Sequence, residues 1–74
     1  MGSVRLTDAL RIVELMAREG DPRYERAVER WITRLETETD ADPEDVEIAE
    51  AAFIALPTRP EAIGAVKALT LRLA

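Results

Sequence analysis

Hydrophobic residues recur along this chain with the period of an α-helix in four separate segments. No segment alternates with the period of a strand, so the pattern predicts an all-α fold. Glycine, proline and acidic residues mark the ends and place the helices at about 7–19, 22–36, 43–56 and 59–73. Short connections favour antiparallel neighbours, and we therefore expect a compact four-helix domain of two stacked antiparallel helical hairpins.

The first two segments are amphipathic and are separated by a predicted tight turn. Gly20 fits the left-handed end of a helix, and Asp21 followed by Pro22 fits an N-cap and a first-turn proline. We expect Tyr24 and Trp31 to pack in the core, with their polar ends at its edge. The apolar stripe of segment 7–19 comprises Leu6, Leu10, Val13 and Ala17, widened by Ala9, Ile12 and Met16, and that of segment 22–36 comprises Tyr24, Ala27, Val28, Trp31, Ile32 and Leu35.

The last two segments are more apolar and also carry capping signals. Asp42 followed by Pro43 again predicts an N-cap and a first-turn proline, at the start of the third helix. Pro57 ends the third helix, and the stretch from Thr58 to Glu61 reads as a capping box for the fourth. The second half of segment 43–56 is apolar almost all the way round, which indicates a helix covered on several sides. The fourth stripe comprises Ile63, Val66, Leu69 and Leu73.

The 74 residues fit a single helical domain at 4–74, and Met1–Ser3 reads as a start codon with a cloning remnant. The chain has no histidine and no cysteine, and Lys67 is its one lysine. Nucleophilic triads, thiol chemistry and imidazole or thiolate zinc sites are thereby excluded, and we expect no enzyme and no cofactor. No apolar run approaches the roughly 20 residues that span a bilayer, so we expect a cytoplasmic protein.

Acidic residues crowd the predicted connection between the second and third helices. A calcium-binding EF-hand loop that begins at Asp40 would need glycine at its sixth position and glutamate at its twelfth. Those positions are occupied by Asp45 and Ala51, so the pattern excludes an EF-hand. A helix N-cap in a solvated loop explains these carboxylates, and we expect no metal site.

A row of arginines is the most distinctive surface feature. Like charges three or four residues apart destabilise a helix, so we expect acidic groups opposite the row. The chain offers a source, because residues 36–61 hold nine acids and one base, and this favours pairing with Glu44, Asp45, Glu47 or Glu50. The alternatives are the acidic surface of a protein partner and nucleic acid, which a net charge of −5 disfavours. The row comprises Arg23, Arg26, Arg30 and Arg34, and Glu25, Glu29 and Glu36 line the other edge of the polar face.

Three apolar residues fall outside the predicted core stripes: Leu15, Ile54 and Leu71. If they cluster in space, they would form a patch suited to self-association, and a homodimer is one expected state. A further alternative is a carrier for a small hydrophobic ligand, held in the space between Trp31 and Phe53.

The stretch from Pro22 to Ala27, followed by Arg30-Trp31 and Arg34-Leu35, resembles short, alanine- and arginine-rich helical proteins of high-GC actinobacteria. The resemblance implies a bacterial, cytoplasmic origin, and it transfers no activity and no site residue. The sequence therefore predicts a non-enzymatic protein-interaction module. Its partner is expected to be a protein or a second copy of the chain, with no membrane contact and with nucleic acid as the alternative.

Overall fold

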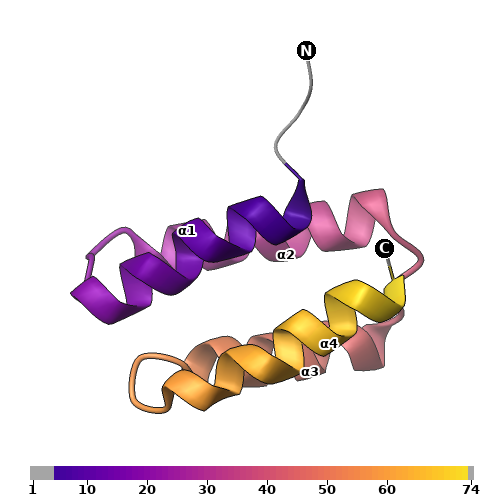
Figure 1. Ribbon diagram of the computed structural model, residues 1–74. Coiled ribbons are helices and arrows are strands. Elements are labelled where there is room, and N and C mark those ends of the chain that lie inside the picture. The colour runs from indigo at the N-terminus through magenta and orange to yellow at the C-terminus, as the bar shows by residue number, and fades with distance from the viewer. Residues whose placement is uncertain (1–4, 74) are drawn as a thin grey trace.

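The computed structural model describes residues 5–73 and contains four α-helices and one short 3-10 turn in that range. The α1–α2 hairpin and the α3–α4 hairpin stack as two layers, which confirms the predicted fold (Figure 1). The suggested cloning remnant, Met1–Ser3, lies outside the described residues. The elements are α1 (Leu6–Glu19), α2 (Tyr24–Glu38), α3 (Pro43–Ala55), η1 (Pro60–Ala62) and α4 (Ile63–Leu73).

The core lies between the two layers, where α2 packs on α3 and α1 packs on α4. At its centre the rings of Trp31 and Phe53 meet edge to face, with their centroids 5.4 Å apart. The indole N–H of Trp31 donates a hydrogen bond of 2.9 Å to the carbonyl of Leu6, so its polar end is satisfied as predicted. The buried apolar residues are Leu6, Leu10, Val13, Ala17, Trp31, Ile32, Leu35, Ala49, Ala52, Phe53, Leu56, Ile63, Val66 and Leu69.

The turn between α1 and α2 depends on one glycine and one aspartate. Gly20 has a φ of 64°, the left-handed conformation that glycine adopts without steric cost, as the sequence predicted. The Asp21 carboxylate accepts a 2.8 Å hydrogen bond from the backbone N–H of Arg23. The backbone carbonyl of Asp21 accepts a hydrogen bond from the backbone N–H of Tyr24. These bonds hold Pro22 and Arg23 in the turn, so α2 begins at Tyr24 rather than at the predicted Pro22.

Both ends of α3 are satisfied by side chains. The Asp42 carboxylate accepts from the N–H of Asp45 at 3.0 Å, and the Asp45 carboxylate accepts from the N–H of Asp42 at 3.2 Å, which confirms the predicted cap. At the other end Pro57 has no N–H to offer the Phe53 carbonyl four residues earlier. The hydroxyl of Tyr24 donates to that carbonyl at 2.6 Å. A side chain of the first hairpin therefore completes a helix of the second.

The predicted capping box from Thr58 to Glu61 is wrong. Arg59 precedes η1, and no side chain caps that turn. The amides of Thr58 and Arg59 bond back to the carbonyl of Ala55, which continues the end of α3 into the connection. Because the chain then enters a 3-10 turn at Pro60, α4 begins only at Ile63.

Two predictions about burial are also wrong. Ile12 was placed in the core stripe of the first helix, but 55% of its surface is exposed. The third helix was expected to be covered on several sides, yet Ile48 is 47% exposed and Ile54 is 81% exposed. The reason is the two-layer arrangement, in which each helix has one neighbour beside it and one across the core, so its outer face remains open.

Candidate interaction surfaces

A groove with an arginine rim runs between α1 and α2, with a volume of about 450 Å³. Its floor is apolar and comes from both helices, and its rim is the arginine row of α2. We call this surface the arginine groove; its floor comprises Ala9, Ile12, Val13, Met16, Ala27 and Trp31, and its rim comprises Arg23, Arg26, Arg30 and Arg34.

The arginines at the two ends of this row are held by neighbours in sequence. Arg23 forms an ion pair of 2.9 Å with Asp21, and Arg34 forms one of 2.8 Å with Glu38, one helical turn away. Hydrogen bonds from the two guanidinium groups keep the pKa values of the Asp21 and Glu38 carboxyls below their usual range. These acids therefore stay charged at neutral pH and anchor the ends of the row.

The two central arginines have no such partner. Arg26 and Arg30 are exposed, and neither forms an ion pair with any residue between 5 and 73. The prediction that the row pairs with acids of the third helix is therefore wrong for Arg23, Arg26 and Arg30. The reason is position, because the row faces α1 and lies on the opposite edge of α2 from α3.

Asp45, one of those predicted partners, is instead bound by the fourth helix. Its carboxylate is buried and accepts a hydrogen bond from the guanidinium of Arg72. The Asp42 amide and the Arg72 guanidinium lower the pKa of Asp45. Asp45 therefore joins the start of α3 to the end of α4, a structural role within the second hairpin.

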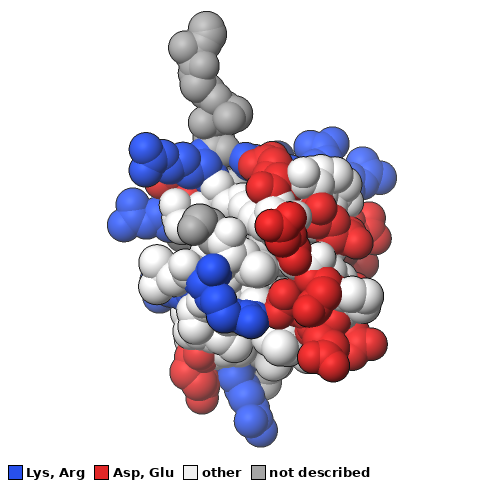
Figure 2. All heavy atoms as spheres, turned by 90° about the vertical axis from the view of Figure 1, so that its right-hand side faces the viewer, with Lys and Arg blue, Asp and Glu red and all other residues white. Residues whose placement is uncertain are grey.

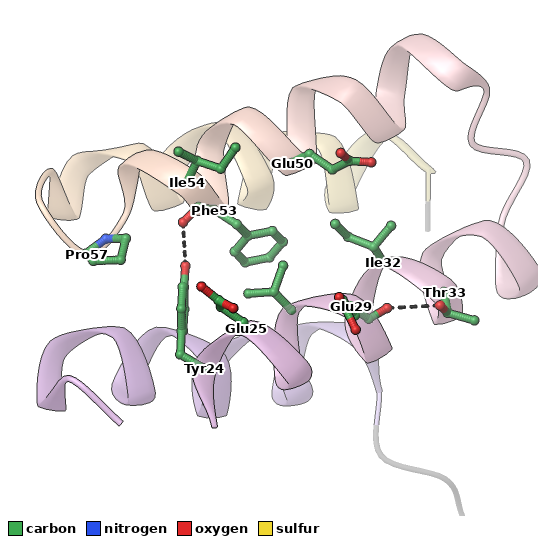
Figure 3. Close-up of a pocket in the computed structure, with 10 residues that line it drawn as sticks. Tyr24, Glu25, Glu29, Ile32, Thr33, Glu50, Phe53, Ile54 and Pro57 are labelled. Atoms are coloured by element: carbon green, nitrogen blue, oxygen red, sulfur yellow. Dashed lines mark hydrogen bonds between the residues drawn. The ribbon is translucent and has the colours of Figure 1, made fainter. Parts of the chain in front are cut away.

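A second groove, with a glutamate rim, runs between α2 and α3 and has a volume of about 800 Å³. Figure 3 shows Glu25 and Glu29 of α2 on one side and Glu50 of α3 on the other, with the Tyr24–Phe53 hydrogen bond at one end. We call this surface the glutamate groove; its apolar lining comprises Tyr24, Val28, Ile32, Phe53, Ile54 and Pro57.

The glutamate groove was not predicted as a site. The sequence identified Glu25 and Glu29 only as the far edge of the polar face of α2, and the approach of Glu50 depends on how the hairpins stack. Figure 2 views the molecule from the end at which α2 connects to α3, and there acidic side chains gather on the side on which α2 and α3 lie. The two edges of α2 thus present opposite charges.

The three predicted self-association residues are all exposed, but they do not share a groove. Ile54 lines the glutamate groove, whereas Leu71 lines a different groove between α1 and α4. Leu15 is 53% exposed on α1 and lines neither. These three residues therefore do not form a single patch, and Ile54 instead shares a groove with Val28 and Ile32.

The space proposed for a small hydrophobic ligand is filled. Trp31 and Phe53 are each 2% exposed and their rings touch, so no cavity separates them. Between residues 5 and 73, no three acidic side chains are close enough together to hold a metal ion. In the same range, no helix has the length and apolar character needed to cross a membrane.

The chain matches no protein-family model, and neither a curated protein nor a solved structure is significantly similar to it. The resemblance to actinobacterial helical proteins therefore stays a prediction, and the case for a function depends on the two grooves.

Proposed function

We propose that the protein is a non-enzymatic interaction module of the bacterial cytoplasm that binds an acidic, amphipathic segment of a protein partner in the arginine groove. One observation carries the proposal. Arg26 and Arg30 are exposed and have no ion-pair partner among residues 5–73, and they stand beside an apolar floor that includes the half-exposed Ile12.

The chemistry of the groove matches a partner with both acidic and apolar groups. Arginine binds carboxylates through two parallel N–H groups and keeps its charge at all physiological pH values. Burial of Ile12 and Met16 under apolar side chains contributes roughly 25 cal/mol per Å². An amphipathic helix that lies in a groove supplies such side chains at three- and four-residue spacing. The arginines would steer and orient the partner, and the floor would supply affinity.

The same row also fits phosphate groups, which keeps nucleic acid as the alternative. Two features favour a protein partner. Glu25 and Glu29 lie on the same helix and the whole chain has a net charge of −5, so a phosphate backbone meets repulsion close to the row. The floor of the groove is apolar and offers nothing for a sugar-phosphate backbone to contact.

The test uses a synthetic amphipathic peptide of about 18 residues, long enough to form a helix, with leucine on one face and glutamate beside it. Calorimetry should show binding, and Arg26→Glu with Arg30→Glu should raise Kd about tenfold or more, equivalent to about 1.4 kcal/mol. The matched control is Glu25→Arg with Glu29→Arg, which changes as many charges on the other edge of α2 and should retain binding.

Circular dichroism separates recognition from folding, because the arginine variant should keep its helical signal. Unfolding of that variant would instead show that the arginines are structural. Equal affinity of the wild type and the arginine variant would overturn the proposal. Retention on duplex DNA at low salt, lost steeply as salt rises, would support the nucleic-acid alternative in its place.

A further inference from the structure

The two grooves lie on either side of the same helix and have opposite rims. Arg26 and Arg30 face the α1 side of α2, and Glu25 and Glu29 face the α3 side. Each pair is four residues apart, which corresponds to about 6 Å along the helix axis. Two carboxylates of one molecule therefore have the axial spacing needed to meet two guanidinium groups of another.

The apolar parts of the grooves also match. Each groove holds one isoleucine that the fold leaves open to solvent: Ile12, 55% exposed, in the arginine groove and Ile54, 81% exposed, in the glutamate groove. Contact between two such side chains removes apolar surface from water, which favours association. A contact between unlike grooves would bring together both the isoleucines and the opposite charges.

Contacts between like grooves are disfavoured. If two arginine grooves met, Arg26 and Arg30 of one molecule would face the same arginines of the other. If two glutamate grooves met, the acids of one molecule would face the same acids of the other. Like charges placed together across an interface repel each other and disfavour binding. Of the possible contacts between these two grooves, the charge pattern favours the one in which the arginine groove of one molecule meets the glutamate groove of another.

We infer that the chain assembles with itself head to tail, with the arginine groove of each copy seated on the glutamate groove of the next. This inference depends on the proposed function, because it names a second copy as the partner that the arginine groove binds. Such a contact is heterologous, and each added copy leaves one groove of each kind open. Assembly therefore continues beyond a dimer until a ring closes.

The experiment measures solution mass by light scattering and sedimentation velocity over a range of concentrations. The wild-type mass should rise past twice the chain mass of 8.3 kDa and should fall as salt is added. Arg26→Glu with Arg30→Glu, and Glu25→Arg with Glu29→Arg, each remove one of the two surfaces. Each variant alone should remain monomeric.

The decisive sample is an equimolar mixture of the two variants. The mixture should assemble again, because the glutamate groove of one variant meets the arginine groove of the other, and the two reversed rims also carry opposite charges. Each reversal changes the net charge by two, so the wild-type −5 becomes −9 in one variant and −1 in the other. Because both variants stay negative, attraction between net charges would not produce this assembly.

Three results would overturn the inference. A wild type that stays monomeric at millimolar concentration would exclude self-assembly and would leave the peptide test of the proposed function unaffected. A wild type that stops at a dimer would contradict head-to-tail assembly, because no groove would then be open to a third copy. Variants that still associate would place the contact on another surface. If a charge reversal unfolds the domain, Arg26→Ala with Arg30→Ala and Glu25→Gln with Glu29→Gln replace them, with the same loss of mass expected.

Discussion

The two hairpins differ in how their charged and apolar residues are arranged. The α1–α2 hairpin has amphipathic helices, the charges of α2 are segregated to its two edges, and the hairpin forms the whole arginine groove from its own residues. The α3–α4 hairpin is more apolar, contributes Phe53 and Val66 to the most deeply buried positions, and ties itself together through Asp45 and Arg72. The arginine groove is therefore built within the first hairpin, and the second hairpin contributes only the core on which the first hairpin packs.

The glutamate groove belongs to neither hairpin alone. Its acids come from α2 and α3, and the hydrogen bond from Tyr24 to the Phe53 carbonyl joins the two hairpins at its end. Any change that loosens the hairpins from each other should therefore alter the glutamate groove before it alters the arginine groove.

The largest expected effect is that of Phe53→Ala, which removes the ring that joins the second hairpin to Trp31. Truncation of a buried phenylalanine costs about 3–5 kcal/mol, comparable to the whole stability expected of so small a core. Urea unfolding followed by circular dichroism should show a domain that is largely unfolded at 25 °C.

The neighbouring residue supplies the control for that change. Ile54 is 81% exposed, so Ile54→Ala should alter the free energy of unfolding by no more than about 0.5 kcal/mol. If the two variants were equally stable, Phe53 would not be the link between the hairpins.

An intermediate effect is expected for Asp42→Ala, which removes the N-cap of α3. Loss of an aspartate cap costs about 1 kcal/mol, and here it also frees the N–H of Asp45. Thermal unfolding should show a lower Tm for this variant than for Asp40→Ala, an exposed acid in the same connection. Equal Tm values would mean that α3 does not need its cap.

A similarly modest effect is expected for Tyr24→Phe, which removes the hydrogen bond between the hairpins and keeps the ring. The net cost of one such bond is about 1 kcal/mol. Burial raises the pKa of Tyr24 to about 12, against about 10 in an unfolded chain, so the folded state holds the phenol proton more tightly. The contribution of this group is therefore complete below about pH 10 and is lost as the pH rises towards 12.

Denaturant titrations at pH 9 and pH 11.5 test this prediction. The wild type should lose more stability between the two values than Tyr24→Phe does. An identical loss in both proteins would show that the phenol of Tyr24 does not report on the contact between the hairpins.

Features that depend on a few adjacent residues were predictable. The left-handed glycine at Gly20, the cap at Asp42 and the buried positions of Trp31 and Leu35 all follow from spacing along one helix. The arginine row was predictable for the same reason, because residues three or four apart share a face of any helix. The fold class and the two antiparallel hairpins followed from those helices and from the short connections between them.

The wrong predictions concern contacts between elements. The arginine row was assigned to acids of the third helix because the charges balanced, but charge balance says nothing about which edge of α2 faces which neighbour. Ile12 was assigned to the core because periodicity cannot tell where an apolar stripe stops being covered. Thr58 was assigned a capping role because its motif fits, whereas the chain bonds back to Ala55 instead.

Local periodicity and capping signals were thus sufficient to predict the helices, their order and the basic edge of α2. These features depend on steric contacts and hydrogen bonds that act within one helical turn. The stacking of the hairpins decided which groups meet across the core. It brought Glu50 beside Glu25 and Glu29, and it gave the Phe53 carbonyl a donor in Tyr24. Such pairings join residues 21 to 29 positions apart, and the side-chain packing that selects them has no periodic signal in the sequence.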